Sequence, residues 1–286
     1  MNIKMDNIYL IGNDHTVCQD YSYSGLINQI PYIIISDGCS QAKNSDIGAR
    51  LLVHSIKNFF DKYFILDNID FIMNNFPGIL NDYIMTLKKL IKMKFDLFIE
   101  DLDLNNDITY ATIRFACIVN NKLILINFGD GYSILSKNGV EISRIYTRFE
   151  SNAPFYLSYF INDLVDQYIR NFPNEEIECN GSIFNVRDYI SRKENFLQII
   201  NLDTLEDGEY CISVMSDGVD TFFNNGDKIP VDEIIKSLTE FKNTNGTFVE
   251  RRVRKYVLQC VKNNVKHYDD ISIASMIFNI ENGKIK

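Results

Sequence analysis

Aspartates adjoin several strand-like segments of this 286-residue chain, and carboxylates are the side chains that hard divalent cations bind. The apolar runs 32–35, 123–128, 211–215 and 271–278 stand beside Asp37, Asp130, Asp217 and the pair Asp269-Asp270. Strand ends from two packed sheets can converge on one edge. Four acidic strand ends in one chain therefore predict a shared metal site.

Two divalent cations held about 3.5–4 Å apart by shared carboxylates are suited to phosphoester hydrolysis, because they activate water and stabilise both entering and leaving oxygens. Such a site needs a bridging carboxylate, further acidic ligands, and a backbone carbonyl that the ion can approach. A glycine after the bridging acid permits that approach. The residues that fit these roles are Asp37, Gly38, Asp217, Asp269 and the pair Gln19-Asp20.

Asp-Gly is also a common turn dipeptide, so each of these acids has an alternative interpretation as a turn residue. A hairpin turn should lead into a second alternating strand. Instead, Asp37-Gly38 is followed by the polar stretch CSQAKNSD, and Asp217-Gly218 by VDTFFNNGD. Hairpins explain these two positions poorly, and we prefer the metal interpretation.

The available ligand types select the metal. The chain has three histidines and six cysteines, and no two cysteines form a CxxC pair. Zinc and a disulfide framework are both disfavoured, and the cysteines read as small buried hydrophobes. Oxygen ligands favour Mg²⁺ or Mn²⁺.

The charge balance limits the partners. A formal net charge of -9 without a long basic run argues against nucleic acid or an anionic membrane surface as a partner. The first residues read as neither a signal peptide nor a membrane span, because their short apolar stretch contains polar and acidic residues. We expect a cytoplasmic protein.

The order of the elements indicates the fold class. Strands are predicted over residues 8–11, 21–27, 32–36, 109–119, 122–128, 132–136, 196–202, 209–215 and 271–278. Helices are predicted over residues 47–60, 76–100, 162–171, 229–241 and 247–267. Many strands with helices grouped at two points favour an α+β fold: two antiparallel sheets packed as a sandwich, with helix pairs on the outer faces. A doubly wound parallel sheet is the weaker option.

We expect residues 1–286 to form one domain, because the chain has no linker-like stretch or composition shift. Residues 144–193 carry a weaker pattern, with loop expected over 173–182, and we expect them to form a lid or flap between strands. In the last helix, Leu258 and Val261 are expected to face the core with Phe248, Val249 and Val253.

Five short motifs carry a family resemblance when they are taken in order. They are HTVCQD, ISDGCS, GDGY, SDGVD and YDDIS, between His15 and Met276. At these separations the set resembles the metal-dependent protein serine/threonine phosphatases, the PPM or type 2C family, in a divergent bacterial form. The resemblance implies a four-layer α-β-β-α sandwich with a binuclear Mn²⁺ or Mg²⁺ site at one end of the two sheets.

The same resemblance implies a role for each matching residue. Asp37 would bridge both ions and Gly38 would give its carbonyl to one of them, while Asp217 and Asp269 would complete the other. Asp130 matches the position that helps hold a weaker third ion in bacterial members. The implied substrate is a protein phosphorylated on serine or threonine in a bacterial signalling pathway, with a cognate kinase as the opposing enzyme.

Three positions depart from the family pattern. Gln19-Asp20 stands where the family commonly has Glu-Asp, so either the neutral amide or Asp20 must serve the second ion. His15 stands where an arginine usually clamps the substrate phosphate, and a histidine offers one charge-assisted donor instead of a bidentate fork. Cys39 replaces a histidine of many eukaryotic members.

Two functions of different classes follow. The first is a phosphatase in which water attacks phosphorus directly, since no cysteine lies in a phosphate-loop signature. The second is a catalytically weak or inactive regulatory binding module that keeps the sandwich. A third, weaker option is a metallohydrolase for a small phosphorylated metabolite.

Overall fold

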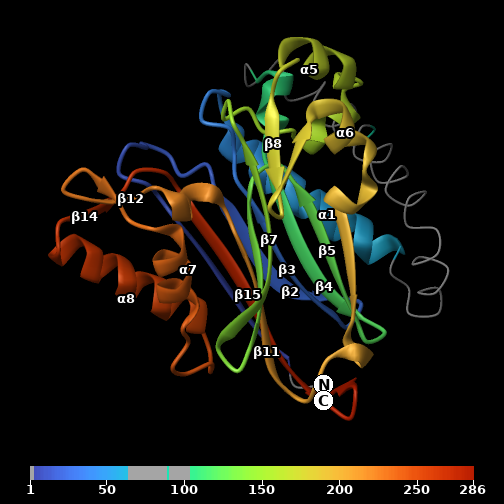
Figure 1. The fold of residues 1–286 in the computed structure, drawn as a ribbon, viewed down its shortest axis with the longest axis vertical. Helices are drawn as coiled ribbons and strands as arrows, with labels where there is room; N and C mark the ends of the chain where they lie inside the picture. Colours follow the sequence, from blue (N-terminus) through green and yellow to red (C-terminus); the bar gives the residue numbers. More distant parts are fainter. Residues whose placement is uncertain (1–2, 64–88, 90–103) are drawn as a thin grey trace.

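A computed structural model describes residues 3–63, 89 and 104–286 (Figure 1). The helix expected over residues 76–100 lies outside the described residues, apart from residue 89. No helix within the described ranges is long and apolar enough to cross a membrane.

Two antiparallel sheets form the centre of the molecule. The larger sheet has the order β1-β15-β11-β6-β7-β8-β9, with β16 paired to β15. Its strands are β1 (Lys4–Leu10), β6 (Gly131–Lys137), β7 (Val140–Phe149), β8 (Glu176–Cys179), β9 (Ser182–Asn185), β11 (Gly208–Met215), β15 (Ile271–Glu281) and β16 (Lys284–Ile285). The smaller sheet has the order β10-β5-β4-β3-β2. It contains β2 (Tyr21–Ile27), β3 (Ile30–Ser36), β4 (Ile113–Val119), β5 (Lys122–Phe128) and β10 (Leu197–Asn201).

Helices cover the outer face of each sheet (Figure 1). Helix α1 (Ser45–Tyr63) packs on the smaller sheet through Leu52, Val53 and Ile56. Helices α7 (Val231–Thr239) and α8 (Phe248–Lys262) pack on the larger sheet. A third apolar cluster lies between the two sheets. The expected α+β sandwich of two antiparallel sheets with outer helices is confirmed.

The burial of strand β3 explains why apolar and polar residues do not alternate along it. All seven of its residues are buried. Ile33 and Ile35 belong to the cluster between the sheets, whereas Tyr32 and Ile34 face the cluster under α1. Both faces of this strand therefore need apolar side chains, as in any strand covered on two sides.

Several predicted boundaries are wrong. The strand expected over 8–11 begins at Lys4 and ends at Leu10. The strand expected over 109–119 begins only at Ile113, because residues before it form the short 3-10 helix η2 (Asn106–Thr109). The helix expected over 247–267 ends at Lys262, and Asn264 then adopts a positive φ of 58°. The chain continues as β14 (Val265–His267), which pairs with β12 (Phe222–Asn224) in a small sheet completed by β13 (Asp227–Lys228).

The burial expected along α8 is also wrong in part. Phe248, Val249 and Val253 are buried as predicted, but Leu258 and Val261 are 63% and 65% exposed. Cys260 is buried and Val257 packs in the same cluster, so the core-facing side of the helix continues into its last turns and Leu258 and Val261 lie on another side.

Residues 144–193 contribute to the sheet and to the core. Strand β7 continues to Phe149, and β8 and β9 extend the larger sheet, so the loop expected over 173–182 is wrong. The short helices α4 (Leu157–Ile161), α5 (Val165–Asn171) and α6 (Val186–Ser191) complete the segment. Tyr168 and Tyr189 pack in the cluster under α1. A lid function for this segment stays a prediction.

Candidate active site

The acidic strand ends meet at one cavity of about 440 Å³. Asp37 follows β3 of the smaller sheet, whereas Asp130 precedes β6, and Asp217 begins the 3-10 helix η5 (Asp217–Asp220) after β11. Asp269 stands two residues before β15. All four side chains line the cavity, so both sheets contribute carboxylates to it.

Partial burial and mutual repulsion raise the pKa values of these carboxyl groups. Burial raises the pKa of Asp37 well above its usual range, and the neighbouring Asp20 and Asp217 raise it further. Burial and the charge of Asp217 do the same to Asp130. The pKa of Asp269 rises to about 6, again through burial first and Asp217 second. A bound cation would offset this repulsion, because an opposite charge favours the ionised form of each acid.

Asp20 lies beneath this group and does not line the cavity. Its side chain is 1% exposed, and burial raises its pKa to about 7. Ser216 donates a hydrogen bond of 2.8 Å from its Oγ to Asp20 Oδ2, and the Asp20 carboxyl is also hydrogen-bonded to Asp37. The other oxygen, Asp20 Oδ1, is buried without a hydrogen-bond partner in the described structure. Asp20 is therefore placed to orient Asp37.

Two glycines allow the backbone to approach the site closely. A Cβ on Gly38 would lie 2.8 Å from the carbonyl oxygen of Ser45 and 2.9 Å from that of Gln19. Gly131 has a φ of 112°, and a Cβ there would lie 2.5 Å from the Met215 carbonyl oxygen. Larger residues at either position would displace the strand ends that carry Asp37 and Asp130.

His15 and Gln19 are not brought into this cavity. They line a second cavity of about 330 Å³, which shares Ser40 and Ala42 with the first. Gln19 donates from its side-chain amide to Ser45 Oγ at 2.7 Å. His15 Nδ1 lies 3.0 Å from Asp270 Oδ2, and its Nε2 lies 3.5 Å from Asp269 Oδ1.

The structure separates the two members of the Asp269-Asp270 pair. Asp270 is 1% exposed and accepts hydrogen bonds from the backbone N–H groups of Gly12 and Gln19, at 2.7 and 2.6 Å. It therefore holds the loop between β1 and β2 in place. Burial lowers the pKa of His15, but the hydrogen bond and charge of Asp270 outweigh burial, so the net shift is upward.

Arg114 is a buried cation that the sequence interpretation did not single out. It lies in β4, is fully buried, and donates from Nε to the carbonyl oxygen of Asp130 at 3.1 Å. Its Nη1 donates to Asn127 Oδ1 at 3.1 Å, whereas Nη2 has no partner among the described residues. The sequence does carry a signal for Arg114, because it is a charged residue inside the apolar run 113–119. Buried arginines are rare, so such a residue has a specific role. Arg114 fixes the loop that carries Asp130.

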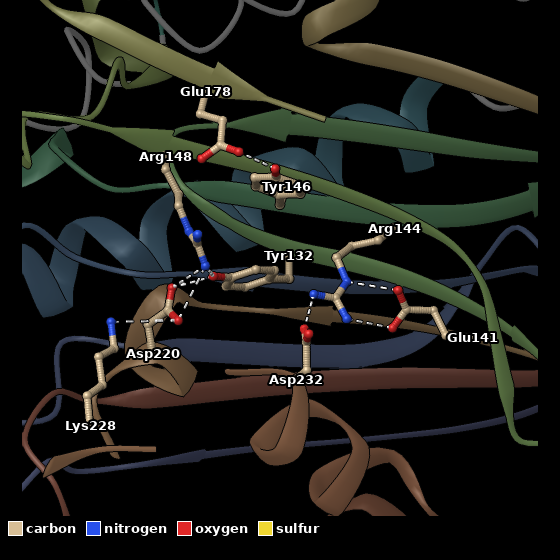
Figure 2. A network of polar contacts seen from close by, with 9 residues as sticks. All are labelled: Tyr132, Glu141, Arg144, Tyr146, Arg148, Glu178, Asp220, Lys228 and Asp232. Carbon is tan, nitrogen blue, oxygen red and sulfur yellow. Dashed lines mark hydrogen bonds and ion pairs between the residues drawn. The ribbon is translucent and has the colours of Figure 1, made fainter. Parts of the chain in front are cut away.

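A network on the surface supports the other side of the site (Figure 2). The hydroxyl of Tyr132 donates to the carboxylate of Asp220, and Arg148 Nη2 lies 3.2 Å from the same carboxylate. Tyr132 follows the loop that carries Asp130, and Asp220 ends the 3-10 helix that begins with Asp217. The Tyr132–Asp220 hydrogen bond therefore links two of the acidic strand ends.

The donor set fits hard divalent cations by its chemistry. Every side chain of the acidic group offers oxygen, and one buried oxygen of Asp20 lacks a partner. Within residues 3–63, 89 and 104–286, no three His, Cys, Asp or Glu side chains already have the arrangement of a formed metal site. The fit rests on the oxygen donors and on the mutual repulsion of the buried acids.

Comparisons with known proteins agree with this geometry. A family model described as protein phosphatase 2C matches residues 12–257. No curated protein matches the chain. Among solved structures, the S. agalactiae serine/threonine phosphatase is 15% identical with a TM-score of 0.51, covering 96% of this chain and 99% of that one.

Two further structures are similar to the same extent. The serine/threonine phosphatase Stp1 from Staphylococcus aureus is 13% identical with a TM-score of 0.57, and the match covers 98% of this chain and 96% of that one. The Mycobacterium tuberculosis serine/threonine phosphatase PstP/Ppp is 12% identical with a TM-score of 0.51, covering 96% and 97%. At these identities the likeness shows a shared fold.

Proposed function

The chain belongs to the protein phosphatase 2C family, and on this premise we propose that it is a metal-dependent phosphatase acting on phosphoserine and phosphothreonine in proteins. The observation that carries the proposal is the convergence of Asp37, Asp130, Asp217 and Asp269 on one cavity. A cognate kinase would supply the phosphorylated substrate.

We propose the metal ligands from the acidic group together with the family pattern. Asp37 would contact both ions, Gly38 would offer its carbonyl, and Asp217 with Asp269 would complete one ion. Asp130 would serve a weaker third ion. Mn²⁺ or Mg²⁺ suits these oxygen donors, and when bound it supplies Lewis acidity and lowers the pKa of water.

The remaining residues position this group. Asp20 receives the Ser216 hydroxyl and contacts Asp37 from beneath, so it limits the orientations open to the Asp37 carboxylate. Arg114 holds the Asp130 backbone, and its charge partly offsets the repulsion between Asp130 and Asp217. Among the described residues that line the cavity, none is Lys, Arg or His. The phosphate charge would therefore be balanced by the cations.

A turnover assay tests the proposal. We expect hydrolysis of p-nitrophenyl phosphate and of a phosphothreonine peptide that requires Mn²⁺ and is lost in Asp37→Asn. Asp166→Asn on α5 is the matched control, since Asp166 is exposed and does not line the cavity. Turnover of a small phosphorylated metabolite but not of the peptide would point to a metabolite hydrolase.

A regulatory binding module without full activity is the second candidate. It is favoured by Gln19 and His15, which line the second cavity and stand where the family pattern has an acid and an arginine. Calorimetric titration with Mn²⁺ separates the two candidates. Saturable binding of two ions supports the enzyme, and the absence of saturable binding supports the module.

A further inference from the structure

Three tyrosines line the same cavity as the acids. Tyr110, Tyr156 and Tyr159 all line it. The Tyr110 ring lies 5.8 Å from Tyr156 at 13° between planes and 5.4 Å from Tyr159 at 26°. Tyr156 and Tyr159 are 6.1 Å apart at 15°. The three rings thus form one stacked group, called here the tyrosine end.

The tyrosine end is fixed by the core behind it. Tyr159 stacks on the buried Phe155 at 5.4 Å and contacts the buried Tyr168 at 4.7 Å. Tyr168 in turn donates its hydroxyl hydrogen bond to the Ala153 carbonyl oxygen at 2.6 Å. The rings are therefore held in place before any ligand enters, which lowers the entropic cost of binding against them.

The charge at this end is negative. Asp107 is exposed and lines the same cavity. The Tyr110 backbone N–H donates to the Asp107 carbonyl oxygen at 2.9 Å, and burial, with the Asp107 charge after it, raises the pKa of Tyr110. No Lys, Arg or His among the described residues lines the cavity. Bound cations would neutralise the acidic end, but they would leave Asp107 without a counter-charge there.

Aromatic faces beside a carboxylate form a good site for an organic cation. The negative face of an aromatic ring attracts a guanidinium or ammonium group, and Asp107 adds an ion pair. An apolar side chain would gain only the rings, and an acidic one would be repelled by Asp107. From this we infer that the tyrosine end with Asp107 is a subsite for a Lys or Arg side chain that flanks the phosphorylated residue of the substrate.

The inference rests on the proposed phosphatase function, and a set of matched phosphopeptides tests it. The peptides differ at one flanking position only, which carries Arg, norleucine or Glu. We expect kcat/KM for the Arg peptide to exceed that for the norleucine peptide about three- to tenfold, with the Glu peptide lowest. Non-hydrolysable phosphonate versions give the same order by fluorescence anisotropy, which is a readout independent of turnover.

Variants then separate the charge from the rings. Asp107→Asn should bring the Arg-to-norleucine ratio close to one, whereas the charge-matched control Asp166→Asn should keep it. Tyr110→Leu should lower the ratio and Tyr110→Phe should keep it, because the ring face is retained. Added salt should also reduce the ratio, since the contribution of Asp107 is screened.

The outcomes distinguish the two proposals. Metal-dependent turnover of all three peptides with equal kcat/KM and equal anisotropy would overturn the subsite and leave the phosphatase function standing. A preference for Arg that survives Asp107→Asn and Tyr110→Leu would also overturn it. Failure of every peptide and of p-nitrophenyl phosphate to turn over would count against the phosphatase function, while the anisotropy series would still decide the subsite.

Discussion

The two ends of the cavity are built in opposite ways. The acidic end takes single side chains from the ends of strands in both sheets, and its carboxylates are pressed together against their mutual repulsion. The tyrosine end takes rings from η2 and α4 and the residues beside them, and these rings stabilise one another by stacking. We expect a bound cation to stabilise the acidic end, whereas the rings of the tyrosine end already stabilise one another by stacking.

This difference shows how an arrangement that lowers the stability of the free protein can still serve its function. A group of buried acids lowers the stability of the free protein, but the same repulsion favours cation binding. A wall of packed tyrosines adds to the core and offers its exposed faces for selection. Hydrolysis would thus depend on the acidic end, and the choice of substrate would depend on the tyrosine end.

The largest effect is expected at Asp37. Asp37→Asn should lower kcat/KM for p-nitrophenyl phosphate by about 10²–10³-fold, as for loss of a central electrostatic contributor. The same change should raise the melting temperature of the metal-free protein at pH 8, because the cost of holding a carboxyl group beside Asp20 and Asp217 is removed. Differential scanning fluorimetry checks this second effect. A lower melting temperature would show that Asp37 is not under repulsion.

Stability of the metal-free protein should fall as the pH rises. The folded pKa values of Asp20 and Asp269 are about 7 and about 6, above the ordinary value of 3.8. An acid with a raised folded pKa contributes stability that is present below 3.8 and is lost as the pH rises through its folded pKa. The melting temperature should drop by several degrees between pH 5 and pH 8, at roughly 2 °C per kcal/mol.

Mn²⁺ should reverse that loss. We expect the ion to raise the melting temperature at pH 8 more than at pH 5, because the acids must be ionised to bind it. Asp166→Asn serves as the control and should behave as the wild type. An equal effect of Mn²⁺ at both values of pH would argue against binding at these acids.

Loss of the link between two acidic strand ends should have an intermediate effect. Tyr132→Phe removes the hydroxyl that donates to Asp220 and should weaken Mn²⁺ affinity about tenfold, the lower limit for outer-shell partners. Isothermal titration calorimetry gives the dissociation constant. Lys228→Gln is the control, because Lys228 is 55% exposed and lies 4.0 Å from Asp220. Equal losses in both variants would show that only surface charge matters.

A smaller effect is expected at His15. His15→Gln should change KM for p-nitrophenyl phosphate by less than about threefold, because His15 lines the second cavity and Asp270 keeps its two backbone donors. Steady-state kinetics measures this change. A tenfold rise in KM would support the phosphate role expected for His15 from the family pattern.

The smallest effect concerns metal binding at the tyrosine end. Asp107→Asn should leave the dissociation constant for Mn²⁺ within about twofold of the wild type, since Asp107 is exposed and is not among the proposed metal ligands. Calorimetry under the same conditions checks this value. A large loss of affinity would mean that the two ends of the cavity are electrostatically coupled.

The acidic strand ends could be predicted because their signals are local. An apolar run followed by Asp-Gly identifies both the strand and its end, and this pattern recurs at Asp37 and Asp217. The sandwich could also be predicted, since the predicted strands do not alternate strictly with helices along the chain, and such an order favours antiparallel sheets. The two groups of predicted helices added the expectation that helices cover the outside.

Other parts of the site depend on which way a side chain turns, and this is decided by distant contacts. Asp269 lines the cavity while its neighbour Asp270 turns away to bind the N–H groups of Gly12 and Gln19. His15 faces Asp270 through that same loop, which no local pattern specifies. The apolar pattern of α8 likewise could not show that Leu258 and Val261 lie away from the side that buries Val253 and Cys260.

The tyrosine end shows the same limit most clearly. Tyr110 and Tyr159 are far apart in sequence and carry no motif, and only the packing of η2 against α4 brings their rings to 5.4 Å. The sequence by itself determined the strands, their acidic ends and the family, because these depend on short segments and burial. The tertiary structure alone decided which acids share the cavity and what stands opposite them, because those relations are set by contacts between segments far apart in the chain.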